Sequence, residues 1–169
     1  KIDQMIAEGV DIIDLWATST RPGSPISQAD DEIKILSPII EYLSKNHPNT
    51  YTSIDTYHSS VAEAALEGGA HIINDISGGL YDDKIFAITA RYKAPIVLMH
   101  IQGTPETMQI QPTYKNLVQE VMLHLAQQTE KAIEAGVQDI IIDLGFGFGK
   151  TINHNFTLFD QLENFKIFQ

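Results

Sequence analysis

Short apolar runs alternate with longer segments of helical period along the whole chain. Each run has the length of a strand and is rich in β-branched residues. The runs are continuous rather than alternately polar, which is typical of strands covered on both faces. They lie at residues 10–16, 51–55, 70–74, 94–100 and 139–145. This pattern predicts an α/β protein with parallel strands.

The segments between these runs predict helices, and the first residues of the chain resemble the last turns of another. The predicted helices cover residues 29–45, 59–67, 82–92 and 113–135. Within the first of them, one face carries the apolar residues Ile33, Leu36, Ile40 and Leu43. We expect Pro38 to kink that helix. We also expect Ser59 to cap the helix that follows it, and Gly68-Gly69 to end that helix.

Nearly every apolar run ends in a side chain that can form hydrogen bonds. These residues are Asp14, Asp55, Asn74, His100 and Asp143. In a β/α barrel such strand ends converge on one mouth, whereas in a doubly wound sheet only those at the switch point meet. The pattern therefore favours a barrel, with His100 able to face the mouth. A barrel needs eight strands, so the chain is either a piece of a longer barrel or an unusual half-barrel.

Composition narrows the class of protein further. The 169 residues suit one domain, and no linker divides residues 1–169. The absence of Cys excludes a disulfide framework, a Cys-ligated zinc site and a cysteine nucleophile. A net charge of −11 disfavours binding to nucleic acid or to an anionic membrane. With no membrane-length apolar run and no signal-peptide pattern, we expect a soluble, cytoplasmic protein.

The Gly-rich run at 143–151 fits neither common nucleotide motif. A P-loop that ends in Gly149-Lys150-Thr151 needs Gly where Leu144 stands. A dinucleotide fingerprint that starts at Gly145 or Gly147 needs Gly where Lys150 or Ile152 stands. What remains is either an ordinary turn after a buried strand or a turn that lets a flat ligand come close to the backbone.

Two further groups of polar residues are candidates for ligand binding. Ser19 to Gly23 combines two hydroxyls with a guanidinium that could clamp an anion, although a plain surface loop is the simpler interpretation. Asp55, Asn74 and Asp143 would be costly to bury at strand ends without a partner. A heterocycle with amino and ring N–H donors, such as a pterin, would satisfy them. Helix capping would explain one or two of these residues, but not three on separate strands. The six His residues show no spacing that indicates a metal site.

Together these segments resemble the dihydropteroate synthase family, the pterin-binding barrel enzymes of folate synthesis. The matching stretches occur in the order and spacing of that family and lie at residues 9–23, 53–79, 94–109 and 139–158. The resemblance implies a (β/α)8 TIM barrel, of which this chain supplies about strands 2 to 6. It also implies condensation of 6-hydroxymethyl-7,8-dihydropterin diphosphate with 4-aminobenzoate, which gives 7,8-dihydropteroate and diphosphate.

The resemblance also implies roles for particular residues. Those that would hold the pterin are Asp55, Asn74, Met99 and Asp143. The loop that would close over aminobenzoate contains Thr20, Arg21 and Pro22, and Phe148 would line the aminobenzoate pocket. Magnesium is implied as a cofactor, although its Asn ligand has no match in this chain. A homodimer is a further possibility that the resemblance raises.

The chain departs from the family pattern in several places. Trp16-Ala17-Thr18 replaces the usual glycines before the loop, and Leu144 replaces a Pro. The first strand of the family and its last two strands have no match here. We therefore expect these 169 residues alone to bind pterin weakly and not to turn over substrate.

Two alternatives remain open, a non-catalytic pterin-binding module and a pterin-dependent methyltransferase domain. Thr20-Arg21-Pro22 argues against the methyltransferase domain, which has no need of such a loop. We further expect residues 17–28 to be mobile without ligand, because the segment is polar and has neither helical nor strand period.

Overall fold

The computed structural model describes residues 1–18 and 28–168, and within them a five-stranded parallel sheet is the central feature. The strands follow one another across the sheet in sequence order, β1-β2-β3-β4-β5. They are β1 (Ile12–Leu15), β2 (Tyr51–Asp55), β3 (Ile72–Asp75), β4 (Ile96–Met99) and β5 (Ile140–Asp143). Each overlaps a predicted apolar run, with β3 ending one residue beyond its run, so the prediction of five parallel strands is confirmed.

Helices connect the strands wherever the helical period predicted them. They are α1 (Ile2–Ala7), α2 (Ala29–Asn46), α3 (Ser59–Glu67), α4 (Lys84–Tyr92), α5 (Leu117–Glu134) and α6 (Ile152–Asp160), followed by the 3-10 helix η1 (Leu162–Phe168). No helix in the described part of the chain is long and apolar enough to cross a membrane.

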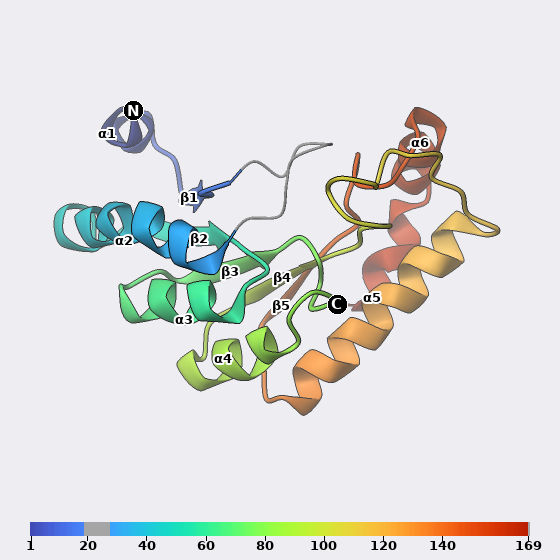
Figure 1. Cartoon of the computed structure of the whole chain (residues 1–169). Helices are drawn as coiled ribbons and strands as arrows, with labels where there is room; N and C mark the ends of the chain where they lie inside the picture. The colour runs from blue at the N-terminus through green and yellow to red at the C-terminus, as the bar shows by residue number, and fades with distance from the viewer. Residues whose placement is uncertain (19–27, 169) are drawn as a thin grey trace.

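The strand order separates the two candidate architectures. A doubly wound sheet reverses its strand order at a switch point and carries helices on both faces. Here the order never reverses, and α2, α3 and α4 lie side by side along the same side of the sheet (Figure 1). The prediction of a β/α barrel over a doubly wound sheet is therefore confirmed, with β1 and β5 as the two edges of the described barrel segment.

The main hydrophobic core lies between the sheet and the helices that cover it. Side chains paired in the parallel ladders point to the same face, and Ile54, Ile73 and Ile96 form one such row across β2, β3 and β4. All three are fully buried. From α2, the core receives Leu36, Ile40 and Leu43, and Ile33 packs against it partly buried, so the predicted apolar face is confirmed.

Helix α2 runs through Pro38 without a break, and Pro38 lies on the exposed face, where water can satisfy the carbonyl group that lacks its helical N–H partner. The prediction for the start of α3 needs correction. Ser59 does not cap α3. The N-cap is His58, and Ser59 is the first helical residue, whose backbone N–H donates to Asp82 Oδ2 at 2.9 Å. The end of α3 is as predicted, with Gly68 at the C-cap and Gly69 at φ +102°.

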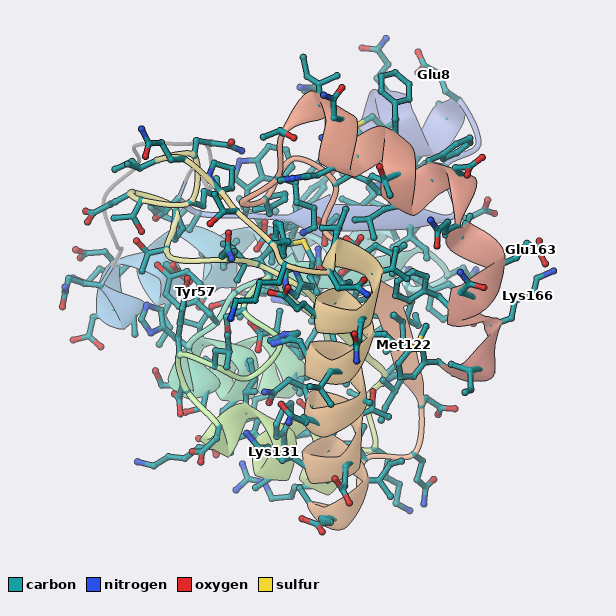
Figure 2. All side chains as sticks on the ribbon, turned by 90° about the vertical axis from the view of Figure 1, so that its right-hand side faces the viewer. Glu8, Tyr57, Met122, Lys131, Glu163 and Lys166 are labelled. Carbon is teal, nitrogen blue, oxygen red and sulfur yellow. The ribbon has the colours of Figure 1, made fainter. Side chains whose placement is uncertain are left out.

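A second apolar cluster attaches the C-terminal elements to the sheet. Its buried members include Leu125 of α5, Leu144 after β5, Leu158 of α6 and Phe165 of η1. Met122 packs against this cluster, and Figure 2 shows it on the side of α5 that faces the C-terminal segment. Glu163 and Lys166 project outward from η1 in the same view. The cluster thus holds α5, α6 and η1 beside β5.

We expect Ile73→Ala to lower the free energy of unfolding by about 2–5 kcal/mol, because it empties space in the middle of the sheet. Urea denaturation followed by circular dichroism would measure this loss. Ile35→Ala is the matched control, since Ile35 lies on the exposed side of α2, and it should change stability by less than about 0.5 kcal/mol. Equal losses for the two variants would contradict this assignment of the core.

Candidate active site

The second face of the sheet carries the polar residues that the sequence placed at strand ends. Asp14 pairs with Ser53, Asp55 with Asn74, and Met99 with Asp143 in the parallel ladders. Along each strand these residues alternate with the buried side chains that pack against α2, α3 and α4. They therefore point to the opposite face of the sheet. Asp55, Asn74, Met99 and Asp143 therefore occupy the carboxyl ends of four neighbouring strands on one face.

A short polar network links the first strands of this face. The side-chain amide of Asn74 donates to Asp14 Oδ2 at 3.3 Å across the intervening β2. Asp55 lies between them in the sheet, and its Oδ1 atom is buried without a hydrogen-bond partner in the described part of the chain. Sequence reasoning noted Asp14 as a strand end but did not place it in the site. Its contact with Asn74 shows that it belongs to the same network.

Burial, together with the neighbouring carboxylates of Asp14, Glu32 and Asp75, raises the pKa of Asp55 to about 7. Glu32 comes from the first turn of α2, where it accepts a hydrogen bond from Thr56 Oγ1 at 2.9 Å. From sequence, Glu32 is one of three acidic residues in that turn, and nothing distinguishes it from its exposed neighbours. The Asp55 carboxyl group is thus poised to accept hydrogen bonds from a ligand that carries N–H donors.

The sequence left open that some strand-end residues only hydrogen-bond to the backbone that follows them. Asp75 does this, whereas Asn74 does not. Asp75 points to the opposite face of β3 and is fully buried. Its carboxylate accepts from the backbone N–H groups of Ser77 and Gly79 and from the Ser77 hydroxyl, at 2.7–2.8 Å. Burial raises its pKa to about 6, and these hydrogen bonds oppose that shift. Asp75 therefore fixes the turn after β3, and the side chain of Asn74 remains on the site face.

Asp143 and Met99 form the other side of the candidate site. Asp143 Oδ1 accepts from the backbone N–H of Gly145 at 2.8 Å, which anchors the start of the Gly-rich loop. Met99 is buried in a small apolar cluster with Tyr57, Ile76, Ile101 and Met108. Phe148, from the same loop, packs against this cluster together with Tyr81. The loop after β5 thus places an aromatic side chain against the apolar cluster that contains Met99.

His100 does not face the mouth, which corrects the expectation drawn from its position at a strand end. It follows Met99 and so points to the other side of β4, where its ring makes an edge contact with His124 of α5 at 4.9 Å between centroids. Burial lowers the pKa of His100 to about 3, so its ring is neutral at physiological pH. Lys150 contacts His100 and is itself buried, with only 3% of its surface exposed.

The predicted aminobenzoate loop lies outside the described residues. Thr20, Arg21 and Pro22 lie in residues 19–27, as does most of the segment expected to be mobile. Trp16 follows β1 and is 62% exposed. No group of three or more acidic or histidine side chains within residues 1–18 and 28–168 could hold a metal ion.

A one-directional parallel sheet with its polar side chains at the carboxyl ends of the strands defines the class as a TIM-barrel fold, of which this chain forms a segment. Comparison with known proteins gives the family within this class. The family described as "Pterin binding enzyme" matches residues 1–169. The chain therefore belongs to the pterin-binding enzyme family.

Curated relatives agree with this family. The chain is 42% identical to dihydropteroate synthase of Streptococcus pyogenes serotype M1 over 164 residues, which are 96% of this chain and 59% of the relative. It is 39% identical to folic acid synthesis protein fol1 of Schizosaccharomyces pombe over 165 residues, which are 96% of this chain and 22% of that protein. The chain thus spans between a fifth and three fifths of the length of these relatives.

Solved structures show the same fold. The Yersinia pestis dihydropteroate synthase in complex with a sulfonamide drug superposes with a TM-score of 0.91 at 31% identity, covering 97% of this chain and 60% of that one. The Thermus thermophilus enzyme in complex with 4-aminobenzoate gives a TM-score of 0.86 at 39% identity, covering 96% of this chain and 61% of that one.

We expect Asp55→Asn to stabilise the ligand-free protein at pH 8 but not near pH 4. Because the pKa of Asp55 in the folded chain, about 7, exceeds its ordinary value of 3.8, ionisation of this group favours unfolding. The resulting loss of folding stability is absent below about pH 4 and reaches its full size above about pH 7. Urea midpoints measured from pH 4 to pH 8 would show the difference growing with pH. Asp11→Asn, at an exposed position before β1, should show no such trend.

Proposed function

We propose that the protein is a dihydropteroate synthase, which joins a dihydropterin to 4-aminobenzoate in folate biosynthesis. The observation that carries this proposal is the row of Asp55, Asn74, Met99 and Asp143 at the carboxyl ends of four adjacent strands. Membership of the pterin-binding family supports it, as do relatives named dihydropteroate synthase and a related structure that holds 4-aminobenzoate.

The chemistry of the row matches the edge of a pterin ring. Asp55 and Asp143 accept hydrogen bonds from the 2-amino group and the ring N–H, and Asn74 pairs with an edge that has both a donor and an acceptor. Met99 offers an apolar surface to the flat face of the ring. Because Asp55 Oδ1 has no partner in the described residues, a donor from the ligand relieves a desolvation cost that the ligand-free protein carries.

The proposed reaction needs positioning more than acid or base catalysis. The amine nitrogen of 4-aminobenzoate forms a bond to the pterin methylene carbon, and the bond from that carbon to the diphosphate oxygen breaks. Diphosphate leaves with the electron pair, and the amine loses a proton. The residues of this chain hold the pterin at its ring edge and place Phe148 against the apolar cluster that contains Met99, where aminobenzoate would lie.

Magnesium enters only as the family resemblance implies it, as a counter-ion of the diphosphate. The described residues contain no group of three acidic or histidine side chains that could ligate a metal ion by themselves. The loop residues Thr20, Arg21 and Pro22 are proposed to close over aminobenzoate. Their placement lies outside the described residues.

We also propose a cytoplasmic homodimer that acts on small molecules and does not bind nucleic acid. The net charge of −11 supports the last point because it repels a polyanion. Exposed apolar side chains on α6 support association, since Ile152, Phe156 and Phe159 expose 69–73% of their surface. Sedimentation velocity of the purified protein would test the dimer.

The direct test uses the protein as its gene encodes it, with dihydropterin diphosphate, 4-aminobenzoate and magnesium. Formation of dihydropteroate, detected by chromatography and mass, is the expected result. Pterin binding without product would favour a non-catalytic pterin-binding module instead. Binding of neither substrate would overturn the proposal.

We expect Asp143→Asn to weaken pterin binding by roughly 10- to 100-fold, the usual loss for a hydrogen bond to a charged group. The amide can still accept from Gly145 N–H through one oxygen, but its NH2 group then faces the N–H donors of the pterin. Isothermal titration calorimetry with a dihydropterin would measure the change. Asp139→Asn is the matched control at an exposed position directly before β5, and it should bind as the wild type does.

A further inference from the structure

Lys150 forms an unusual buried junction beneath the candidate site. Its ammonium nitrogen lies 2.9 Å from Gly145 O, 3.0 Å from Phe148 O, 3.1 Å from His100 O and 2.9 Å from His100 Nδ1. Two of these acceptors belong to the Gly-rich loop after β5, and two belong to the residue that follows β4. A single charged group therefore joins the ends of two adjacent strands.

The acceptors around Lys150 suit a cation and leave it no access to substrate. An ammonium group has three N–H donors, and four acceptors surround it within 3.1 Å. Neutral His100 can accept at Nδ1 only if its proton resides on Nε2. In the sequence, Lys150 stands out only as the Lys of an incomplete P-loop pattern. The structure turns its ammonium inward, with 3% of the residue exposed.

Close packing and hydrogen bonds constrain the backbone of the loop that Lys150 contacts. Gly145 has φ +66°, and a Cβ there would lie 2.0 Å from His100 O, so only glycine permits this approach of the loop to β4. Phe148 N–H donates to Gly145 O at 3.1 Å, and Tyr114 Oη–H donates to Gly149 O at 2.7 Å. Lys150 is the charged member of this set, and it contacts both ends of the turn from Gly145 to Phe148.

We propose that Lys150 is a positioning residue for the candidate site. Its buried ammonium holds the Gly-rich loop against the end of β4 and thereby sets where Asp143 and Phe148 lie relative to Met99. The effect of Lys150 on substrate binding rests on the proposed function. The ordering of the loop by Lys150 rests only on the hydrogen bonds given above.

The first experiment measures the loop directly by amide hydrogen exchange and needs no activity. In Lys150→Met, exchange at residues 145–149 should accelerate by about tenfold or more, while exchange in β2 and β3 stays as in the wild type. Lys45→Met is the matched control, because Lys45 is exposed near the end of α2 and pairs only with Glu41 in the described contacts. If loop exchange is unchanged, or if exchange rises equally throughout the sheet, the positioning role is wrong.

The second experiment uses steady-state kinetics of the protein as its gene encodes it. In Lys150→Met we expect the KM for 4-aminobenzoate to rise roughly tenfold, with kcat changed by less than about threefold, because the displaced Phe148 weakens binding before the reaction. A fall in kcat at unchanged KM would overturn the assignment. Absence of turnover in the wild type would refute the proposed function, and the exchange data would still decide the role of Lys150 in the loop.

If Lys150→Met does not fold, Lys150→Gln takes its place in both experiments. The amide of Gln can donate two hydrogen bonds but carries no charge. It should fold and show an intermediate acceleration of loop exchange. Wild-type exchange rates in the Gln variant would show that charge is not required and would refute the proposal.

Discussion

The register of the parallel ladders is the constraint on which the rest of this structure depends. Pairing Ile54 with Ile73 and Ile73 with Ile96 buries one face of the sheet against the helices. Because side chains alternate along each strand, the same register sets Asp55 beside Asn74 and Met99 beside Asp143 on the other face. A slip by one residue would bury the carboxylates in the apolar core and expose the isoleucines, so the energy of the core also fixes the geometry of the candidate site.

The aspartates of this region differ in the hydrogen-bond partners of their carboxylates. The Asp75 carboxylate accepts three hydrogen bonds within its own turn, and the Asp143 carboxylate accepts one from the backbone N–H of Gly145 in the Gly-rich loop. Asp55 keeps a buried oxygen that has no partner among the described residues, and its burial and the nearby carboxylates raise its pKa. An unsatisfied acceptor at a strand end is costly for a fold and useful for binding a ligand with N–H donors.

The opposite side of β4 carries two buried basic side chains, Lys150 and His100. Burial lowers the pKa of Lys150 to about 7 and the pKa of His100 to about 3, whereas the Asp143 carboxylate raises the pKa of Lys150. The His rings contact one another between β4 and α5. This basic junction and the acidic face are joined by the Gly-rich loop, whose first residues bond to Asp143 and whose carbonyl groups bond to Lys150.

The sequence by itself determined the strand and helix segments, the parallel class, the barrel topology and the polar residues that end the strands, because hydrophobic period and strand-end polarity are local signals. It could not determine that Asp75 forms its hydrogen bonds within its own turn, nor that Ser59 follows the N-cap. It also could not show that His100 points toward α5 or that Lys150 turns inward. Those outcomes depend on which face of a strand is buried and which carbonyl groups lie within reach, and only the packed tertiary structure sets both.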